Sequence, residues 1–139
     1  MKAVVFSTQS FEKELLAKAN NKKHEITLIA NPLTLETAYF AEGKEVVIVS
    51  ERDHLSEQVI LELQKYGISY ISNRTGETHH IDRQAVGRAK MKIAIVLSND
   101  TTEIAKQTIK NLDNWQAGKC TGNACACANS CQKPKKDKR

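Results

Sequence analysis

Residues 92–118, KIAIVLSNDTTEIAKQTIKNLDNWQAG, decide the fold of this chain. The apolar run at 93–96 is typical of a buried strand, and a polar turn and a long amphipathic helix follow it. Asp100 is placed to cap that helix, with Glu103 reaching back to it as in a capping box. Gly118 stands where a helix end favours a residue without Cβ. The stretch therefore predicts one strand followed by one helix.

The rest of the chain repeats this unit four times. The earlier apolar runs, which predict strands, are residues 3–6, 26–29, 46–49 and 68–71. The predicted N-caps of the helices that follow these strands are Ser10, Thr34, Ser56 and Asp82, and Gly43 and Gly67 are predicted helix ends. Strict alternation with short connections predicts an α/β fold, a flavodoxin-like doubly wound five-stranded parallel sheet of order 2-1-3-4-5.

Composition bounds the kinds of partner. A chain of 139 residues has room for one core, which suggests a single domain. The net charge is +5, and residues 132–139 supply +4 of it, with five Lys or Arg against one Asp. The remaining chain is close to neutral and has no basic face with interleaved aromatic residues, so we expect no nucleic acid partner.

The cysteines all follow the last predicted helix, at positions 120, 125, 127 and 131. No apolar run approaches the roughly 20 residues of a membrane span, and the first residues enter a strand without a leader-like apolar segment. We therefore expect a cytoplasmic protein without membrane contact, with reduced thiols. Residues 1–118 are predicted to fold as the domain, and residues 119–139 to form a flexible, disordered tail that is Cys-rich and then basic.

Any ligand site of a doubly wound sheet is expected in the loops at the carboxyl ends of its strands. The six glycines nowhere form G-x-G-x-x-G, and the loop at 7–10 has none. Phosphate-cradling loops need glycine for close backbone approach, so neither FMN nor a nucleotide is expected, and no cofactor in the domain.

The most polar loop is residues 73–80, NRTGETHH. Arg74, with the backbone of Thr75, Gly76 and Glu77, could hold a carboxylate, because a guanidinium offers two parallel donors. The alternative, which residue types alone favour, is that Arg74 pairs with Glu77 or Asp82 and only orders the turn. Residues 79 and 80 are both histidines that could ligate a metal, but no third ligand is evident and a solvated turn is favoured.

These residues also resemble a known family. Arg74 followed by Ile81 and Asp82, after one predicted strand and before the next, is similar to the R-x-x-G-x-x-x-[IV]-D segment of D-isomer-specific 2-hydroxyacid dehydrogenases, and of D-lactate dehydrogenases in particular. Residues 2–16 and 33–49 resemble the opening strands and helices of that family, and residues 108–119 its final helix. The departures are Glu77 in place of the family's glycine, Gly76 one position early, His79 and His80 at asparagine-like positions, and Ser98 to Thr101 in place of a Tyr-Ser-Pro turn.

The resemblance covers about residues 1–119 and implies a substrate domain. In that family a nucleotide-binding domain separates the last strand of the substrate domain from the final helix, and it carries the glycine fingerprint and the catalytic arginine, glutamate and histidine. Here residue 96 leads into the final helix directly, so the resemblance implies that this chain has no catalytic residue. It also implies that residues 74–77 contact the substrate. Because dimers of the family form largely through the absent domain, it implies a monomer.

Three functions remain open from the sequence. The first is a stand-alone, non-catalytic binding or regulatory module for a small carboxylate or a protein partner. The second is a D-2-hydroxyacid (lactate) dehydrogenase component that uses NAD on a nucleotide domain from another chain. The third is soft-metal binding, of Zn or Cu, through the thiols of Cys120, Cys125, Cys127 and Cys131. The alternatives for this segment are a disordered extension without a ligand and a thiol cluster that serves redox exchange.

Overall fold

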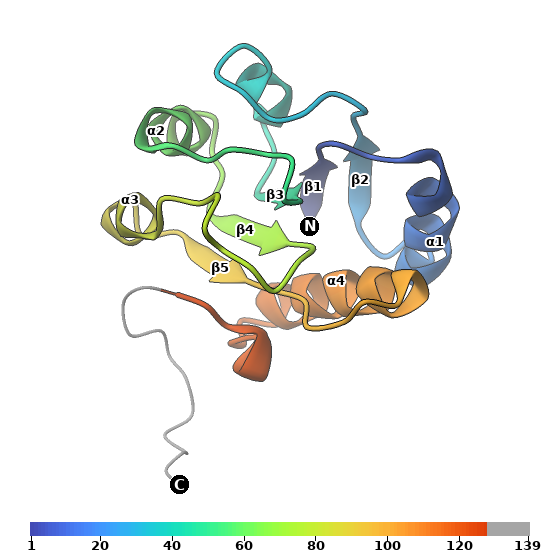
Figure 1. Ribbon diagram of the computed structural model, residues 1–139. Coiled ribbons are helices and arrows are strands. Elements are labelled where there is room, and N and C mark those ends of the chain that lie inside the picture. Colours follow the sequence, from blue (N-terminus) through green and yellow to red (C-terminus); the bar gives the residue numbers. More distant parts are fainter. Residues whose placement is uncertain (128–139) are drawn as a thin grey trace, which may run out of the picture.

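A computed structural model describes residues 1–127 and shows one sheet between two layers of helices (Figure 1). The strands are β1 (Lys2–Val5), β2 (Glu25–Leu28), β3 (Val46–Val49), β4 (Tyr70–Asn73) and β5 (Lys92–Ala94). They pair in the order β2-β1-β3-β4-β5, and every pairing between them is parallel. The predicted fold class and strand order are therefore confirmed.

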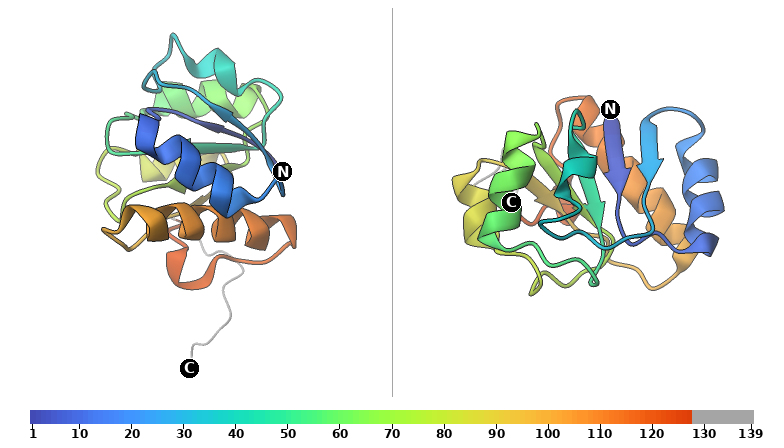
Figure 2. Two further views of the ribbon diagram at one scale, coloured as in Figure 1. Left: turned by 90° about the vertical axis from the view of Figure 1, so that its right-hand side faces the viewer. Right: turned by 90° about the horizontal axis from the view of Figure 1, so that it is seen from above.

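Helices cover both faces of the sheet. They are α1 (Ser10–Asn20), α2 (Glu57–Lys65), α3 (Arg83–Arg88) and α4 (Thr101–Gln116), with short 3-10 helices η1 (Ala38–Ala41) and η2 (Gly122–Ala124). Figures 1 and 2 show α1 and α4 side by side on one face, and η1, α2 and α3 on the other. Right-handed crossovers between parallel strands give this two-sided arrangement.

Side-chain alternation along the strands builds a separate core on each face. In β1, Ala3 and Val5 point toward α1 and α4, whereas Val4 points toward α2 and η1. The α1/α4 side is closed by Leu112 and by Trp115, whose ring stacks on Tyr70 at a centroid distance of 4.7 Å. Because both faces of the central strands are covered, β3 is apolar and buried throughout.

Two predicted elements differ from the structure. The helix expected after Thr34 is reduced to η1, because Thr37 Oγ1 accepts from the Thr34 amide and donates to the Pro32 carbonyl, which holds the chain in turns. The strand expected at 68–71 begins two residues later, at Tyr70. Ile68 instead donates its amide to Leu63 in the turn that ends α2.

Most predicted caps are confirmed. The side chains of Ser56, Asp82 and Asp100 accept from backbone amides in the first turns of α2, α3 and α4. Gly43, Gly67 and Gly118 all have positive φ, as residues that end helices commonly do. One predicted cap is wrong, because Gln9 precedes α1 and donates its amide to Glu12, which leaves Ser10 inside the helix. The capping box predicted at Asp100 is also wrong, since the Asp100 amide donates to Ser98 Oγ rather than to Glu103.

The segment after α4 differs from the predicted flexible tail as far as Cys127. Ile95 donates its amide to Ala124 at 2.7 Å and Ala126 donates to Ile93 at 2.9 Å, so residues 124–126 pair antiparallel with the edge strand β5. An edge strand presents unpaired N–H and C=O groups, and this segment satisfies them on β5. Cys131 and the basic run lie outside the described residues.

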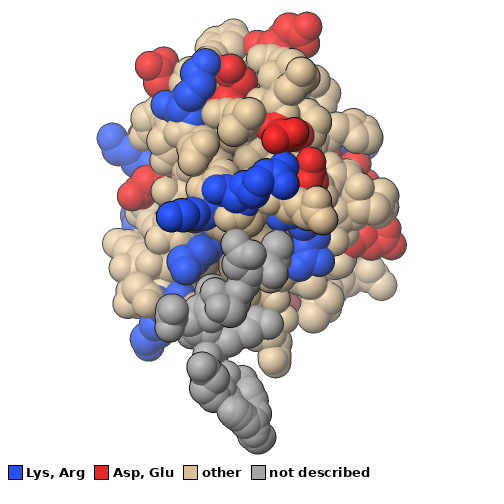
Figure 3. Space-filling model, turned by 90° about the vertical axis from the view of Figure 1, so that its left-hand side faces the viewer, with Lys and Arg blue, Asp and Glu red and all other residues tan. Residues whose placement is uncertain are grey.

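Charge is mixed on the face that carries α2 and α3. Figure 3 shows side chains of both signs there, and Arg88 of α3 pairs with Glu57 of α2 at 3.2 Å. Among residues 1–127, no helix is long and apolar enough to cross a membrane.

Helix α4 is tied to the α1–β2 connection through Asp113. Its carboxylate lies 2.8 Å from Lys23 Nζ and 2.7 Å from Nε2 of the buried His24. His24 is itself held by Asn20, which accepts from its amide and donates to its carbonyl. Partial burial alone would raise the pKa of Asp113, but hydrogen bonds from Lys23 and His24 outweigh it and lower the pKa below the usual value.

Asp113→Asn should therefore destabilise the fold, with the melting temperature at pH 7 falling by roughly 2–5 °C. Because the folded-state pKa is depressed, the stabilisation is fully present above the ordinary aspartate pKa of about 3.9 and is lost as the pH falls through the lower folded value. Thermal unfolding of both proteins from pH 7 to pH 3 measures this, and the gap should shrink below about pH 4.

Glu103→Gln is the matched control, since it removes the same charge from the same helix, and among residues 1–127 Glu103 has no such ion-pair partners. An equal destabilisation in both variants, or a gap for Asp113→Asn that is independent of pH, would contradict the role given to Asp113.

Candidate functional site

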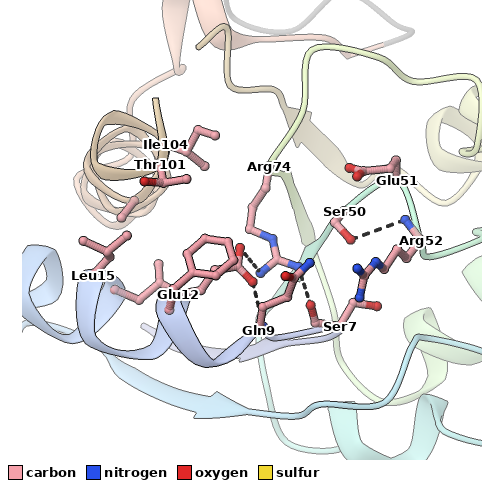
Figure 4. A pocket seen from close by; sticks show the side chains of 13 residues that line it. Ser7, Gln9, Glu12, Leu15, Ser50, Glu51, Arg52, Arg74, Thr101 and Ile104 are labelled. Carbon is pink, nitrogen blue, oxygen red and sulfur yellow. Dashed lines mark hydrogen bonds and ion pairs between the residues drawn. The ribbon is translucent and has the colours of Figure 1, made fainter. Parts of the chain in front are cut away.

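The loops that follow β1, β3, β4 and β5 border two hollows at the carboxyl ends of the strands. The first, of about 160 Å³, lies where the amino-terminal ends of α1 and α4 meet the loops after β1 and β3 (Figure 4). The second is more open, about 680 Å³, and lies between residues 74–77 and residues 96–99. Both hollows include Glu51, Arg74 and Ile104 in their walls, so they adjoin one another.

Asp53 holds these loops together. Its side chain is fully buried, and it accepts from Ser7 Oγ at 2.7 Å, from the Leu33 amide at 2.8 Å and from the Ser50 amide at 2.8 Å. These donors come from the loops after β1, β2 and β3, and such donors allow a carboxylate to be buried. Sequence reasoning missed Asp53, because nothing in the run ERDH separates a buried aspartate from its exposed neighbours.

Arg74 is also buried, with 6% of its surface exposed. Its Nη2 donates to the Phe6 carbonyl at 2.6 Å. Its Nη1 lies 3.1 Å from Glu12 Oε2, as Figure 4 shows. The predicted pairing with Glu77 or Asp82 is therefore wrong. Burial lowers the pKa of Arg74, and the negative charge of Glu12 opposes that shift. Arg74 connects the end of β4 to β1 and α1.

Residues 75–77 form a turn that lines the second hollow. Asn73 Nδ2 donates to the Glu77 carbonyl at 2.7 Å, and the Glu77 amide donates to Thr75 Oγ1 at 3.3 Å, which fixes a tight turn. Within the described residues the backbone amides of Thr75 and Gly76 have no acceptor. Two successive amides are thus available to an anion in this hollow.

Gly76 brings the turn close to the connection between β5 and α4. A Cβ placed on it would lie 3.2 Å from Leu97 Cδ2 and 3.6 Å from the Val96 carbonyl oxygen. A side chain at this position would therefore narrow the second hollow, and glycine keeps it open.

The two histidines of the loop differ. His79 is exposed and lies 3.3 Å from Glu77 Oε1, as a solvated turn predicts. His80 is buried, and its Nδ1 lies 2.8 Å from the Asp53 carbonyl oxygen, so the prediction of a solvated side chain is wrong for it. Across residues 1–127 no group of three or more His, Cys, Asp or Glu side chains is arranged to hold a metal ion. Cys131, the fourth predicted ligand, lies beyond these residues.

No family model matches the chain. It is 31% identical over 110 residues to D-lactate dehydrogenase of Escherichia coli, which covers 78% of this chain and 33% of that protein. A D-specific alpha-keto acid dehydrogenase of Enterococcus faecalis is 34% identical over 70 residues, 50% of this chain and 22% of that protein.

Solved structures agree. The apo-structure of Escherichia coli D-lactate dehydrogenase superposes with a TM-score of 0.69 at 32% identity, over 72% of this chain and 32% of that one. Salmonella D-lactate dehydrogenase gives a TM-score of 0.69 at 30% identity, over 72% and 31%. The chain spans about a third of the length of these relatives. This chain is therefore homologous to one domain-sized portion of the D-lactate dehydrogenases and of the D-2-hydroxyacid dehydrogenase family to which they belong.

Proposed function

We propose that this chain binds the carboxylate of a small 2-oxo or 2-hydroxy acid at residues 74–77, as the substrate-binding portion of its relatives. The observation that carries the proposal is the pair of backbone amides at Thr75 and Gly76, which have no acceptor among the described residues and border the second hollow. The names of the relatives, lactate and keto acid dehydrogenases, supply the substrate class.

Arg74 supports this role from behind the turn. Because its guanidinium is engaged by Phe6 and Glu12, it positions the turn and contributes positive charge rather than gripping the ligand with both nitrogens. Ser98 and Asn99 face the turn across the hollow and supply further polar groups for an acid bearing an oxo or hydroxyl group.

Binding without chemistry is the role proposed for these 139 residues on their own. Hydride transfer requires a nicotinamide held against the substrate and an acid or base beside it. The sequence contains no glycine fingerprint, and two side chains that could suggest acid–base chemistry, those of Asp53 and His80, are buried and bonded within the protein.

A second candidate is a dehydrogenase that closes over this hollow with a nucleotide-binding unit. Leu97 favours it, since this apolar side chain is 69% exposed and lines the second hollow. A unit docking there would bury Leu97 and exclude water from the bound acid, as lids do in enzymes.

Carboxylate binding is expected to involve the amides of Thr75 and Gly76 directly. Titration with pyruvate or D-lactate, followed by amide NMR shifts, should move these two signals first. Glu77 bears an exposed carboxylate beside the same amides, so Glu77→Gln should tighten binding by roughly two- to fivefold at low salt by removing like-charge repulsion.

Glu42→Gln is the matched control, because Glu42 is exposed and precedes β3. It therefore lies at the amino-terminal ends of the strands, away from the hollow at their carboxyl ends. It should leave the dissociation constant unchanged. The proposal would be contradicted if the amide NMR shifts spread over the surface without saturating, or if the signals of residues 75 and 76 did not move.

The chain as it stands should neither bind NADH nor reduce pyruvate. A pyrophosphate needs a glycine-rich turn at a helix N-terminus, and the loop before α1 contains no glycine. Titration of NADH fluorescence tests this, with an intact D-lactate dehydrogenase as the positive control. Saturable binding at micromolar concentration would contradict the proposed division of roles and favour the second candidate.

A further inference from the structure

The sheet has two edges, and residues 1–127 cover only one of them. At one edge β5 pairs with residues 124–126, whereas at the other β2 pairs with β1 alone. Figure 1 shows β2 at the end of the sheet, next to α1. An uncovered edge strand is a template for pairing with another strand. The β2 edge is therefore a place where a partner can extend this sheet.

The backbone of β2 is arranged to receive such a strand. The amides of Glu25 and Ile29 donate to the carbonyl oxygens of residues 1 and 5, at N···O distances of 2.9 and 2.8 Å. Successive residues of a strand direct their backbone groups to opposite sides. The N–H and C=O groups of Ile26 and Leu28 therefore point outward, away from β1.

A groove of about 340 Å³ borders this edge on the face that α1 covers. Its apolar wall consists of Leu16 with Ala17 of α1, and Ile26 with Leu28 of β2. Ile26 packs against the core on this face, and Leu28, two residues on, shares the face and is 37% exposed. A strand paired with β2 would place every second side chain in this edge groove.

Two lysines stand at the ends of the edge groove. Lys13 lies in the first turn of α1, near the carboxyl ends of the strands, and Lys22 lies in the turn before β2. Both are exposed, and neither has an ion-pair partner among residues 1–127. The other polar side chains of the groove are engaged, since Asn20 bonds the backbone of His24 and the His24 ring bonds Asp113. The groove thus offers two positive charges to a partner.

We propose that the β2 edge binds an extended acidic peptide segment by antiparallel strand addition, the pairing that residues 124–126 make on the other edge. The backbone of the segment bonds to Ile26 and Leu28, and two of its apolar side chains enter the edge groove. A carboxylate on either side of them lies against Lys13 and Lys22. On one face the segment therefore carries acidic, apolar, apolar and acidic residues at alternate positions.

A second copy of this chain fits the edge less well. Two β2 strands paired about a two-fold axis would bring both α1 helices to the same face of the joined sheet. Both sets of Lys13 and Lys22 would then meet at one interface, where like charges oppose association. Charge complementarity therefore favours an acidic partner over self-association.

The test is binding of a synthetic peptide, acetyl-Asp-Thr-Val-Thr-Val-Thr-Asp-amide, to the full-length protein at low salt. In an amide NMR titration the signals of Ile26 and Leu28 should shift and saturate. The same two amides should exchange with solvent at least several-fold more slowly in the complex, because they gain acceptors.

Two methylated peptides test the pairing itself. Methylation of both valine amides removes the donors that face β2 and should weaken binding roughly tenfold or more. The matched control carries the same two methyl groups on the first two threonine amides, which face away from β2, and it should bind as the parent peptide does. A greater loss with the threonine peptide than with the valine peptide would overturn the proposal.

Lys13→Glu and Lys22→Glu should each weaken binding by roughly two- to fivefold at low salt. Lys18→Glu is the matched control, because Lys18 is exposed on α1 but does not line the groove, and it should bind as the native protein does. Equal losses in all three variants would overturn the proposal. So would slower exchange of the Ile26 and Leu28 amides when the protein is concentrated without peptide, since that indicates self-association through β2.

Discussion

The carboxylate of Asp53 is the interaction on which the carboxyl end of the sheet depends. The loops that follow three strands each donate one hydrogen bond to it. The donors are the Ser7 hydroxyl after β1, the Leu33 amide after β2 and the Ser50 amide after β3. A buried carboxylate is costly unless such donors surround it, so the loops are held in one arrangement or the charge is left uncompensated. The Asp53 carbonyl also lies 2.8 Å from His80, which extends the network to the loop after β4.

This network decides which groups remain for a ligand. Arg74 looks like a ligand-binding arginine in the sequence, yet its guanidinium bonds the Phe6 carbonyl and pairs with Glu12. His80 and Asp53 are similarly engaged, so side chains that suggest chemistry instead serve the scaffold. The backbone of Thr75 and Gly76 is what faces the second hollow, a distribution suited to orienting an anion.

The other end of the sheet has a different constraint, the open edge of β5. The helix α4 ends at Gln116, and the chain returns along β5 to give Ile93 and Ile95 partners in Ala126 and Ala124. Small residues suit this position because they lie close against the strand. The same pairing sets Cys125 opposite Ala94 and brings Cys127 Sγ to 3.5 Å from the Ile93 amide.

The sequence by itself determined the strand order, the helix caps at Ser56, Asp82 and Asp100, and the relationship to the dehydrogenases, because these rest on local periodicity, local hydrogen bonds and linear motif. It could not determine the partners of Arg74, the burial of Asp53 and His80, or the pairing of residues 124–126 with β5. Arg74 bonds to Phe6, 68 positions away, and Asp53 to Ser7, 46 positions away. Such contacts exist only once the sheet brings its loops together, since only then do desolvation and donor geometry choose among polar side chains that are equivalent in the sequence.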